Sequence, residues 1–162
     1  MGWRANCGAV SLSRFNRFLV VKKFLQLSFL PVSSSLGLLI LRLLFGGGIL
    51  GLHGWSKIMN WGQMSEGFPD PLGMGSPVSL AFAILAEVVA AALIVLGLCT
   101  RWAALGLAFT MGVAFFMVHG GALSGEGSGE MAAVYGVAFL VLFLTGAGKI
   151  SIDAKLNAGA AS

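Results

Sequence analysis

Residues 78–98 read VSLAFAILAEVVAAALIVLGL, a run of twenty-one residues in which Glu87 is the single ionisable side chain. A helix needs about 20 mainly apolar residues to cross the hydrocarbon core of a bilayer, so this run is long enough to span a membrane. Hydrophobic residues make up 57% of the whole chain and charged residues only 10%, whereas soluble domains carry about a quarter charged residues. Spanning segments must be helical because lipid offers the backbone no hydrogen-bond partners. The sequence therefore predicts an all-α integral membrane protein.

Three further apolar runs accompany this one, at 35–53, 102–118 and 131–146. Small residues recur at four-residue spacing in all four runs, as with Gly47 and Gly51. Such spacing lets helix backbones approach closely in lipid. We therefore expect a four-helix membrane bundle over residues 35–153, followed by a short cytoplasmic tail at 154–162.

The first 34 residues differ from the bundle, because they hold five basic side chains and no acidic one. Their short apolar part, 24–32, contains Pro31 and is too short to span a bilayer. We expect residues 1–34 to be a basic leader that lies in the cytoplasm or at the membrane interface. A cleaved signal peptide is an alternative, since a basic stretch precedes an apolar one, and an over-long start of the chain is another.

The loop charges predict the orientation in the membrane. If the N-terminus is inside, eight Lys and Arg side chains lie on the inner side and Lys57 alone lies on the outer side. Lys and Arg are enriched in cytoplasmic loops. We therefore predict that both termini are cytoplasmic.

Two ionisable side chains lie deep inside predicted helices, Arg42 in the first and Glu87 in the second. Such groups are costly in a membrane and usually face the interior of a bundle or a wet cavity. At 1.5 Å per residue their depths differ by about 6 Å, which a guanidinium side chain can cover. We predict an Arg42–Glu87 ion pair, and a structural role that fixes helix register is as well supported as a functional one.

Four more polar side chains fall at the predicted outer ends of three helices, namely His53, Lys57, His119 and Glu130. Imidazoles can move protons or hydrogen-bond a carbonyl oxygen, and a nearby carboxylate tunes them. We expect these residues to form a small-molecule or proton-handling site. Each also has a plainer explanation, because a histidine at a helix end often bonds backbone or water. A glutamate at a helix start favours the helix dipole.

Other chemistry has little support in the sequence. The histidines lack the short spacing of a metal motif, and the sequence contains no phosphate-binding loop, nucleophile elbow or nucleic-acid-binding motif. Cys7 and Cys99 form no CxxC pair, which argues against a disulfide-forming oxidoreductase. We therefore predict no metal site and no nucleic-acid partner, assign no catalytic residue, and leave open whether the protein is an enzyme.

Several short motifs occur in a characteristic order between residues 36 and 153. They are Leu41-Arg42-Leu43, Gly46, His53-Gly54, Lys57, Glu87, the segment 96–101 (LGLCTR), His119, Glu130 and the segment 146–153 (GAGKISID). In this order they resemble the DoxX-like family of small membrane proteins. The tail departs from the family's Gly-Pro-Gly-Arg pattern, since Ala147 replaces the proline and Lys149 replaces the arginine.

The resemblance implies a multi-pass, four-helix protein of a bacterial inner membrane. The founding family member is a small subunit of a thiosulfate–quinone oxidoreductase, so our first hypothesis is a redox-linked subunit that binds a quinone or a similar small molecule near the outer face. The second is a non-catalytic scaffold for a soluble or envelope protein, and the third is a small oligomeric transporter. The expected partners are the lipid bilayer, a protein subunit and further copies of the chain.

Overall fold

The computed structural model describes residues 22–23, 25–27 and 31–159. The chain divides into two compact units, 1–33 and 34–162, and the elements given below belong to the second. The basic leader predicted at 1–34 falls largely outside the described residues, so its location and processing stay predictions. Every regular element in the described part of the chain is a helix, which confirms the all-α prediction there.

The first long helix, Ser34–Met59, is continuous over 26 residues. Its segments are α2 (Ser34–Leu41), η1 (Arg42–Gly46), η2 (Ile49–Gly54) and α3 (Trp55–Met59). The sequence predicted a helix over 35–53, but the backbone stays helical through Gly54 and first leaves the helical region at Asn60 (φ −105°, ψ 20°). Lys57 therefore lies inside this helix. The two η segments are π-helical, and each such turn holds more residues than an α-helical turn.

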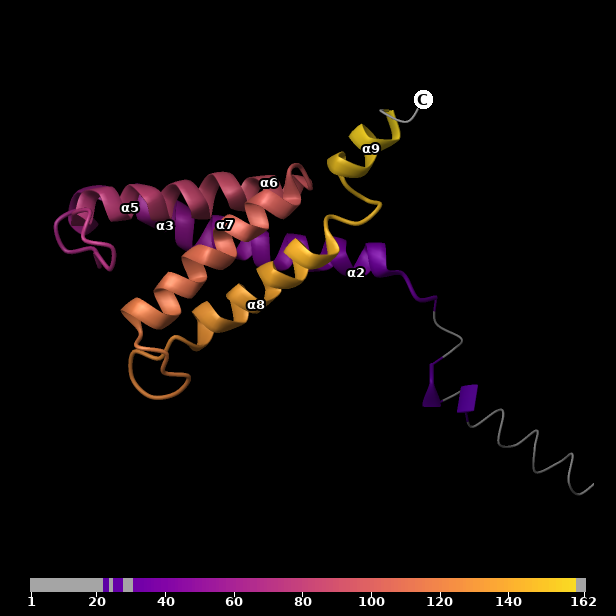
Figure 1. The fold of residues 1–162 in the computed structure, drawn as a ribbon, viewed down its shortest axis with the longest axis horizontal. Helices are drawn as coiled ribbons and strands as arrows, with labels where there is room; N and C mark the ends of the chain where they lie inside the picture. Colours follow the sequence, from indigo (N-terminus) through magenta and orange to yellow (C-terminus); the bar gives the residue numbers. More distant parts are fainter. Residues whose placement is uncertain (1–21, 24, 28–30, 160–162) are drawn as a thin grey trace, which may run out of the picture. The chain divides into compact units, whose positions relative to one another are not determined.

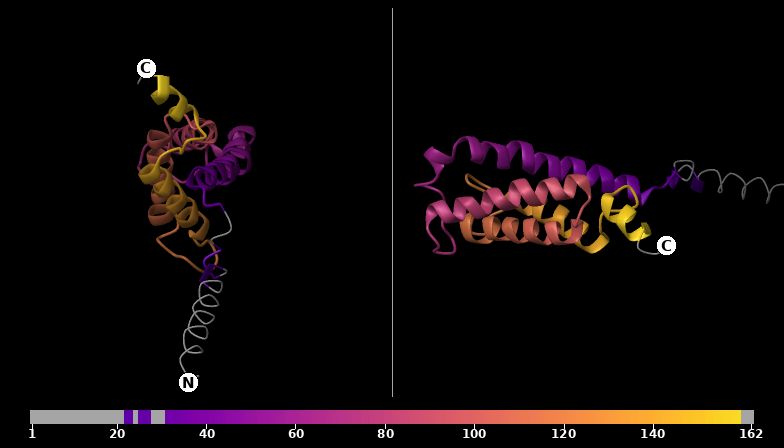
Figure 2. Two further views of the ribbon diagram at one scale, coloured as in Figure 1. Left: turned by 90° about the vertical axis from the view of Figure 1, so that its right-hand side faces the viewer. Right: turned by 90° about the horizontal axis from the view of Figure 1, so that it is seen from above.

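The second and third long helices form a tight hairpin. Their segments are α5 (Ser76–Ile84), η3 (Leu85–Ala90) and α6 (Ala91–Leu96), then α7 (Thr100–Val113) and η4 (Ala114–Val118). The turn between them uses left-handed backbone at Gly97 (φ 71°) and Cys99 (φ 48°). Figure 2 shows the first long helix lying along the α5–α6 helix. Gly54 permits this approach, because a Cβ there would lie 3.0 Å from the carbonyl oxygen of Glu87.

Three helices of the described chain are long and apolar enough to cross a membrane, namely Ser34–Met59, Ser76–Leu96 and Thr100–Val118. A fourth apolar helix, α8 (Glu130–Thr145), packs along α7 and has 16 residues (Figure 1). At 1.5 Å per residue it spans about 24 Å, less than the roughly 30 Å of a bilayer core. Two further short helices lie in this unit, α4 (Trp61–Met64) and α9 (Ile152–Gly159).

The core of the bundle is apolar, and so is much of its outside. Ile94, Leu107 and Phe139 are fully buried between the helices. Large apolar side chains such as Leu44 and Leu144 are nevertheless 66% and 72% exposed. An apolar surface of this kind costs little in lipid and much in water. The structure therefore has the surface of a membrane protein.

Arg42 is 2% exposed and bonds to backbone carbonyl oxygens. It donates from Nε to Ile94 (2.9 Å), from Nη1 to Ala147 (2.7 Å) and Ile150 (2.8 Å), and from Nη2 to Val95 (3.1 Å). The predicted Arg42–Glu87 ion pair is therefore wrong. Carbonyl groups in the last turn of a helix lack intrahelical partners and carry the negative end of the helix dipole. The end of α6 thus supplies better acceptors for Arg42 than Glu87 does.

Asp153 completes this polar cluster from the tail. Its carboxylate accepts hydrogen bonds from the amides of Cys99 (2.7 Å) and Thr100 (2.9 Å) at the start of α7. Burial by itself would raise the pKa of Asp153, but these amide bonds and the nearby Arg42 charge hold that pKa below its usual value. Gly97 must lack a side chain here, because a Cβ would lie 2.8 Å from Cζ of Arg42. The tail motif therefore fastens the end of the chain to the α6–α7 turn.

Candidate functional site

An ion pair lies at the end of the first long helix opposite to Arg42. Nζ of Lys57, in the last turn of that helix, is 2.5 Å from Oε2 of Glu87, in η3. The two side chains are 16% and 7% exposed. Gly54, one turn before Lys57, lets the two helices touch at the depth of Glu87. The ammonium group therefore reaches back along its helix to the carboxylate.

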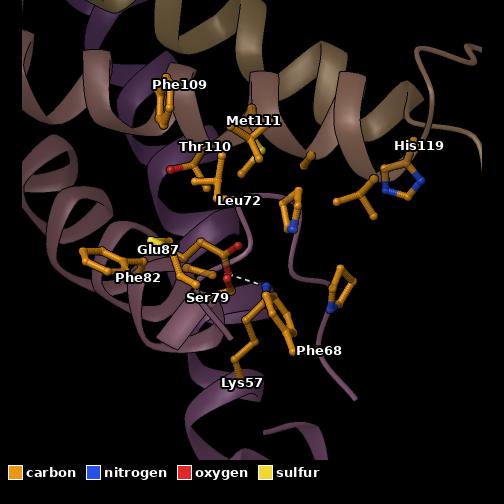
Figure 3. A pocket seen from close by; sticks show the side chains of 17 residues that line it. Lys57, Phe68, Leu72, Ser79, Phe82, Glu87, Phe109, Thr110, Met111 and His119 are labelled. Atoms are coloured by element: carbon orange, nitrogen blue, oxygen red, sulfur yellow. Dashed lines mark hydrogen bonds and ion pairs between the residues drawn. The ribbon is translucent and has the colours of Figure 1, made fainter. Parts of the chain in front are cut away.

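The Lys57–Glu87 pair lies in the wall of a cavity of about 280 Å³. Figure 3 shows the pair between side chains of α5, α7 and the loop that precedes α5. Apart from the pair, its lining is mostly apolar and consists of Phe68, Pro69, Pro71, Leu72, Met74, Ser79, Phe82, Ala83, Phe109, Thr110, Met111, Val113, Ala114, Val118 and His119. Ligand pockets in proteins commonly combine an apolar lining with a few polar groups.

The loop that borders the cavity is held in place by Asp70. Its carboxylate accepts hydrogen bonds from the amides of Met74 (3.0 Å) and Gly75 (2.7 Å) and from the hydroxyl of Ser79 (2.6 Å). The bond from Ser79, followed by those from the loop amides, lowers the pKa of Asp70. Leu72 and Met74, which line the cavity, are therefore positioned by a hydrogen-bonded turn anchored on α5.

His119 lies at the rim of the cavity and contacts the next loop. Its Nδ1 atom is 2.7 Å from the carbonyl oxygen of Gly127. A carbonyl oxygen only accepts hydrogen bonds, so Nδ1 is the donor in this contact, and in the neutral form of the ring Nε2 is an acceptor. His119 thus fixes the loop before α8 and also belongs to the cavity lining.

His53 and Glu130 do not line this cavity. His53 is half-buried, and its ring lies edge-on to Tyr135 of α8 at a centroid distance of 6.0 Å. Glu130 is exposed in the first turn of α8, a position that favours an acidic side chain. Of the four residues that the sequence placed at one mouth, Lys57 and His119 therefore line this cavity.

Sequence reasoning missed two contributors to the site. It paired Glu87 with Arg42 because their depths in the predicted helices differ by only about 6 Å, and so it missed Lys57 as the partner of Glu87. It also gave no role to Asp70, although a carboxylate between two prolines, Pro69 and Pro71, marks a turn that side-chain bonds often complete.

No group of three His, Cys, Asp or Glu side chains in the described part of the chain is arranged to hold a metal ion. The ionisable side chains of the cavity lining are Lys57, Glu87 and His119, and Ser79 and Thr110 add hydroxyl groups. An ammonium group donates hydrogen bonds, and a carboxylate and a neutral imidazole nitrogen accept them. This set can orient a small ring that carries oxygen atoms and can exchange protons with it.

Comparison with known proteins places the chain in a family. The DoxX family profile matches residues 37–120. A protein of Haemophilus influenzae is 32% identical over 112 residues, which cover 64% of this chain and 79% of that protein. A second protein of the same organism is 29% identical over 134 residues, covering 78% of this chain and 87% of its own length. Both are described as uncharacterized, and no solved structure matches the chain significantly. This chain is a membrane protein that belongs to the DoxX family.

Proposed function

We propose that this protein is a redox-linked subunit of a bacterial inner membrane that binds a quinone, or a similar small ring with a carbonyl oxygen, in the Lys57–Glu87 cavity. The proposal is carried by one observation. Lys57 and Glu87 pair with each other in the wall of an apolar cavity, and the described bundle provides neither of them with a second side-chain partner. Most of their hydrogen-bonding capacity is therefore available to a ligand.

The pair has the chemistry that a carbonyl ring requires. An ammonium group has three N–H donors, and the bond to Glu87 uses one of them. A second donor can hold a ring oxygen, and in a largely apolar cavity such a bond is stronger than it is in water. Reduction of a quinone to a quinol takes up two electrons and two protons. Lys57 can deliver one proton to the bound oxygen. Glu87, as the carboxylate of the pair, only accepts, so water supplies the second proton and the proton that recharges Lys57, and the two electrons come from a partner subunit.

The size of the cavity restricts the ligand. Its volume of about 280 Å³ lies near the lower limit of the roughly 300–1,000 Å³ typical of ligand pockets. A single substituted six-membered ring is small enough for such a volume. The chain carries no sequence motif for an electron-carrying group, so in this proposal electrons reach the ring from a partner subunit.

The proposed topology has α8 as the fourth crossing helix and both termini in the cytoplasm. Support comes from the excess of Lys and Arg in the leader, the 2–3 turn and the tail. The apolar character of α8 adds to it. This topology puts the Lys57 cavity near the outer face and the Arg42 cluster near the inner one.

The test is a binding measurement on the purified full chain in mild detergent. The probe is a short-chain benzoquinone, and the method is isothermal titration calorimetry. Lys57→Met removes the donor, and Lys149→Met makes the same chemical change at an exposed position of the tail. We expect Lys57→Met to weaken binding by about tenfold or more, the worth of a charge-assisted hydrogen bond, and Lys149→Met to leave it unchanged.

Lys57→Met also leaves Glu87 buried without its partner, so loss of folding must be separated from loss of binding. The double variant Lys57→Met/Glu87→Met removes both charges and should fold, yet bind as poorly as the single variant. Equal affinity in wild type and in both variants would refute the proposal. Absence of quinone binding together with a stoichiometric partner protein that co-purifies with wild type and Lys57→Met alike would favour the scaffold function.

A further inference from the structure

The cavity lies where α5 and α7 move apart. At their inner ends the two helices are closely associated, since α7 packs against η3 and α6. Toward their outer ends the axes of α5 and α7 diverge (Figure 1). The cavity lies in this divergence, because Ser79, Phe82 and Ala83 line it from α5, and Phe109 and Thr110 line it from α7.

Phe82 and Phe109 belong to the cavity lining and are also 57% and 66% exposed. A side chain that both lines a cavity and faces the outside marks the mouth of that cavity. In Figure 3 the two rings lie on one side of the Lys57–Glu87 pair, and Phe68 and His119 lie on the other. The cavity therefore has a mouth between two phenyl rings on the outer surface of the bundle.

The mouth lies at hydrocarbon depth. Phe82 is six residues from the start of α5 and Phe109 is nine residues from the end of η4, which correspond to about 9 Å and about 14 Å at 1.5 Å per residue. Both helices are among those long and apolar enough to cross a membrane. At the outer end the loop that Asp70 ties to Ser79 borders the cavity, and its lining residues Leu72 and Met74 are also 50% and 42% exposed.

We propose that the cavity opens sideways into the bilayer between Phe82 and Phe109, and that its ligand is a ring with a long alkyl or isoprenoid tail. The ring lies at Lys57 and Glu87, and the tail leaves between the two phenyl rings into the lipid. This inference rests on the proposed ring-binding function and adds the route of entry, the tail and two residues that recognise it.

The experiment uses two benzoquinone probes that share one ring, the first without a tail and the second with a ten-carbon alkyl chain. Binding of each probe to the full chain is measured in the same detergent, so partition of the tailed probe into micelles is equal for all variants. Phe82→Ala/Phe109→Ala removes both phenyl rings of the mouth. Leu85→Ala/Leu105→Ala is the matched control, because these exposed side chains lie on the same two helices outside the cavity lining.

We expect Phe82→Ala/Phe109→Ala to weaken binding of the tailed probe by about tenfold, as for loss of substantial apolar contact. Binding of the tail-less probe should change less than about threefold, and the leucine control should change neither. Equal effects of the two double variants on the tailed probe would overturn the sideways mouth and leave the ring site intact. If wild type binds neither probe, the proposed function fails and this inference fails with it.

A variant that narrows the gap between α5 and α7 tests the route of the tail independently. Ala83→Phe places a ring inside the lining next to Phe82, and Ala81→Phe makes the same change on α5 outside the lining. We expect Ala83→Phe to exclude the tailed probe and Ala81→Phe to bind it as wild type does. Should Ala83→Phe bind the tailed probe normally while it remains folded, the tail does not pass between α5 and α7.

Discussion

The first long helix carries one cationic side chain near each end, and the two differ in how many hydrogen-bond partners the fold gives them. Arg42 is 2% exposed and donates four hydrogen bonds to backbone carbonyls from α6 and the tail. Lys57 has one partner, Glu87, and borders a cavity of about 280 Å³. Four of the five N–H donors of Arg42 are engaged by backbone carbonyls, an arrangement that holds the fold together. A cation with free donors beside a cavity can also act on a ligand.

The largest effect that this comparison predicts is on folding. Arg42→Met should lower the free energy of unfolding by about 3–5 kcal/mol, the usual cost of removing one member of a buried charged network. The loss arises because the carbonyls of Ile94 and Ala147 lose their donor and Asp153 loses a neighbouring positive charge. Thermal unfolding in detergent, followed by circular dichroism, measures it.

Arg42→Lys is the matched control, since it keeps the charge. Lysine has a single nitrogen and cannot reproduce the fork that reaches α6 and the tail together. We expect this variant to recover less than half of the lost stability. If Arg42→Lys unfolds at the wild-type temperature, the positive charge alone stabilises the fold, and the four hydrogen bonds of the guanidinium group add no stability.

Gly97→Ala should have the next largest effect, about 2–3 kcal/mol on the free energy of unfolding, because it combines a left-handed backbone position with a steric clash. The backbone φ of Gly97 is 71°, and a Cβ would lie 2.7 Å from Cβ of Ser151. Gly106→Ala is a suitable control, because Gly106 is helical and no atom lies near the position of its Cβ. Thermal unfolding of both variants decides whether the Arg42 cluster tolerates added volume.

The sequence predicted the helical, apolar nature of the bundle well, because burial in lipid requires long apolar runs and hydrogen-bonded backbone. It also identified Arg42, Lys57 and Glu87 as the charges that need an explanation. Their partners were harder to predict. Backbone carbonyls occur at every residue, so the acceptors of Arg42 have no signature in the sequence, and the nearest buried carboxylate, Glu87, was chosen in their place.

Helix phase was the second obstacle. At a constant 100° per residue, Arg42 and His53 share one face of the first helix, and His53 and Lys57 lie one turn apart on it. The structure has π-helical segments at Arg42–Gly46 and Ile49–Gly54, which shift this phase. In the structure Lys57 contacts Glu87, whereas His53 lies against Tyr135. A sequence pattern that assumes a uniform helix cannot separate these two directions.

The Lys57–Glu87 pair should matter less for stability than the Arg42 cluster. We expect Lys57→Met and Glu87→Gln each to cost about 1–2 kcal/mol, less than a fully buried pair because Lys57 is 16% exposed. The double variant should be less destabilised than the sum of the two, with a coupling of about 1 kcal/mol. A double-mutant cycle by thermal unfolding measures this coupling. A strictly additive cycle would mean that the pair contributes no stability.

The smallest predicted effect concerns the loop over the cavity and its response to pH. The hydrogen bond from Ser79 and those from the loop amides lower the pKa of Asp70 in the folded protein. A lowered folded-state pKa stabilises the loop fully above the unfolded value of about 3.9, and this stabilisation is lost as the pH falls through the lower folded value. Loop order should therefore be constant from neutral pH down to about 4 and should decline below it.

Hydrogen exchange of residues 65–75, analysed by mass spectrometry after correction for the intrinsic pH dependence, tests this expectation. Asp70→Asn should make the loop exchange faster at neutral pH, because an amide side chain accepts fewer and weaker bonds than a carboxylate. Glu66→Gln, at an exposed position of the same loop, should exchange as wild type does. If Asp70→Asn leaves exchange unchanged, the packing of Leu72 and Met74 is enough to hold the loop.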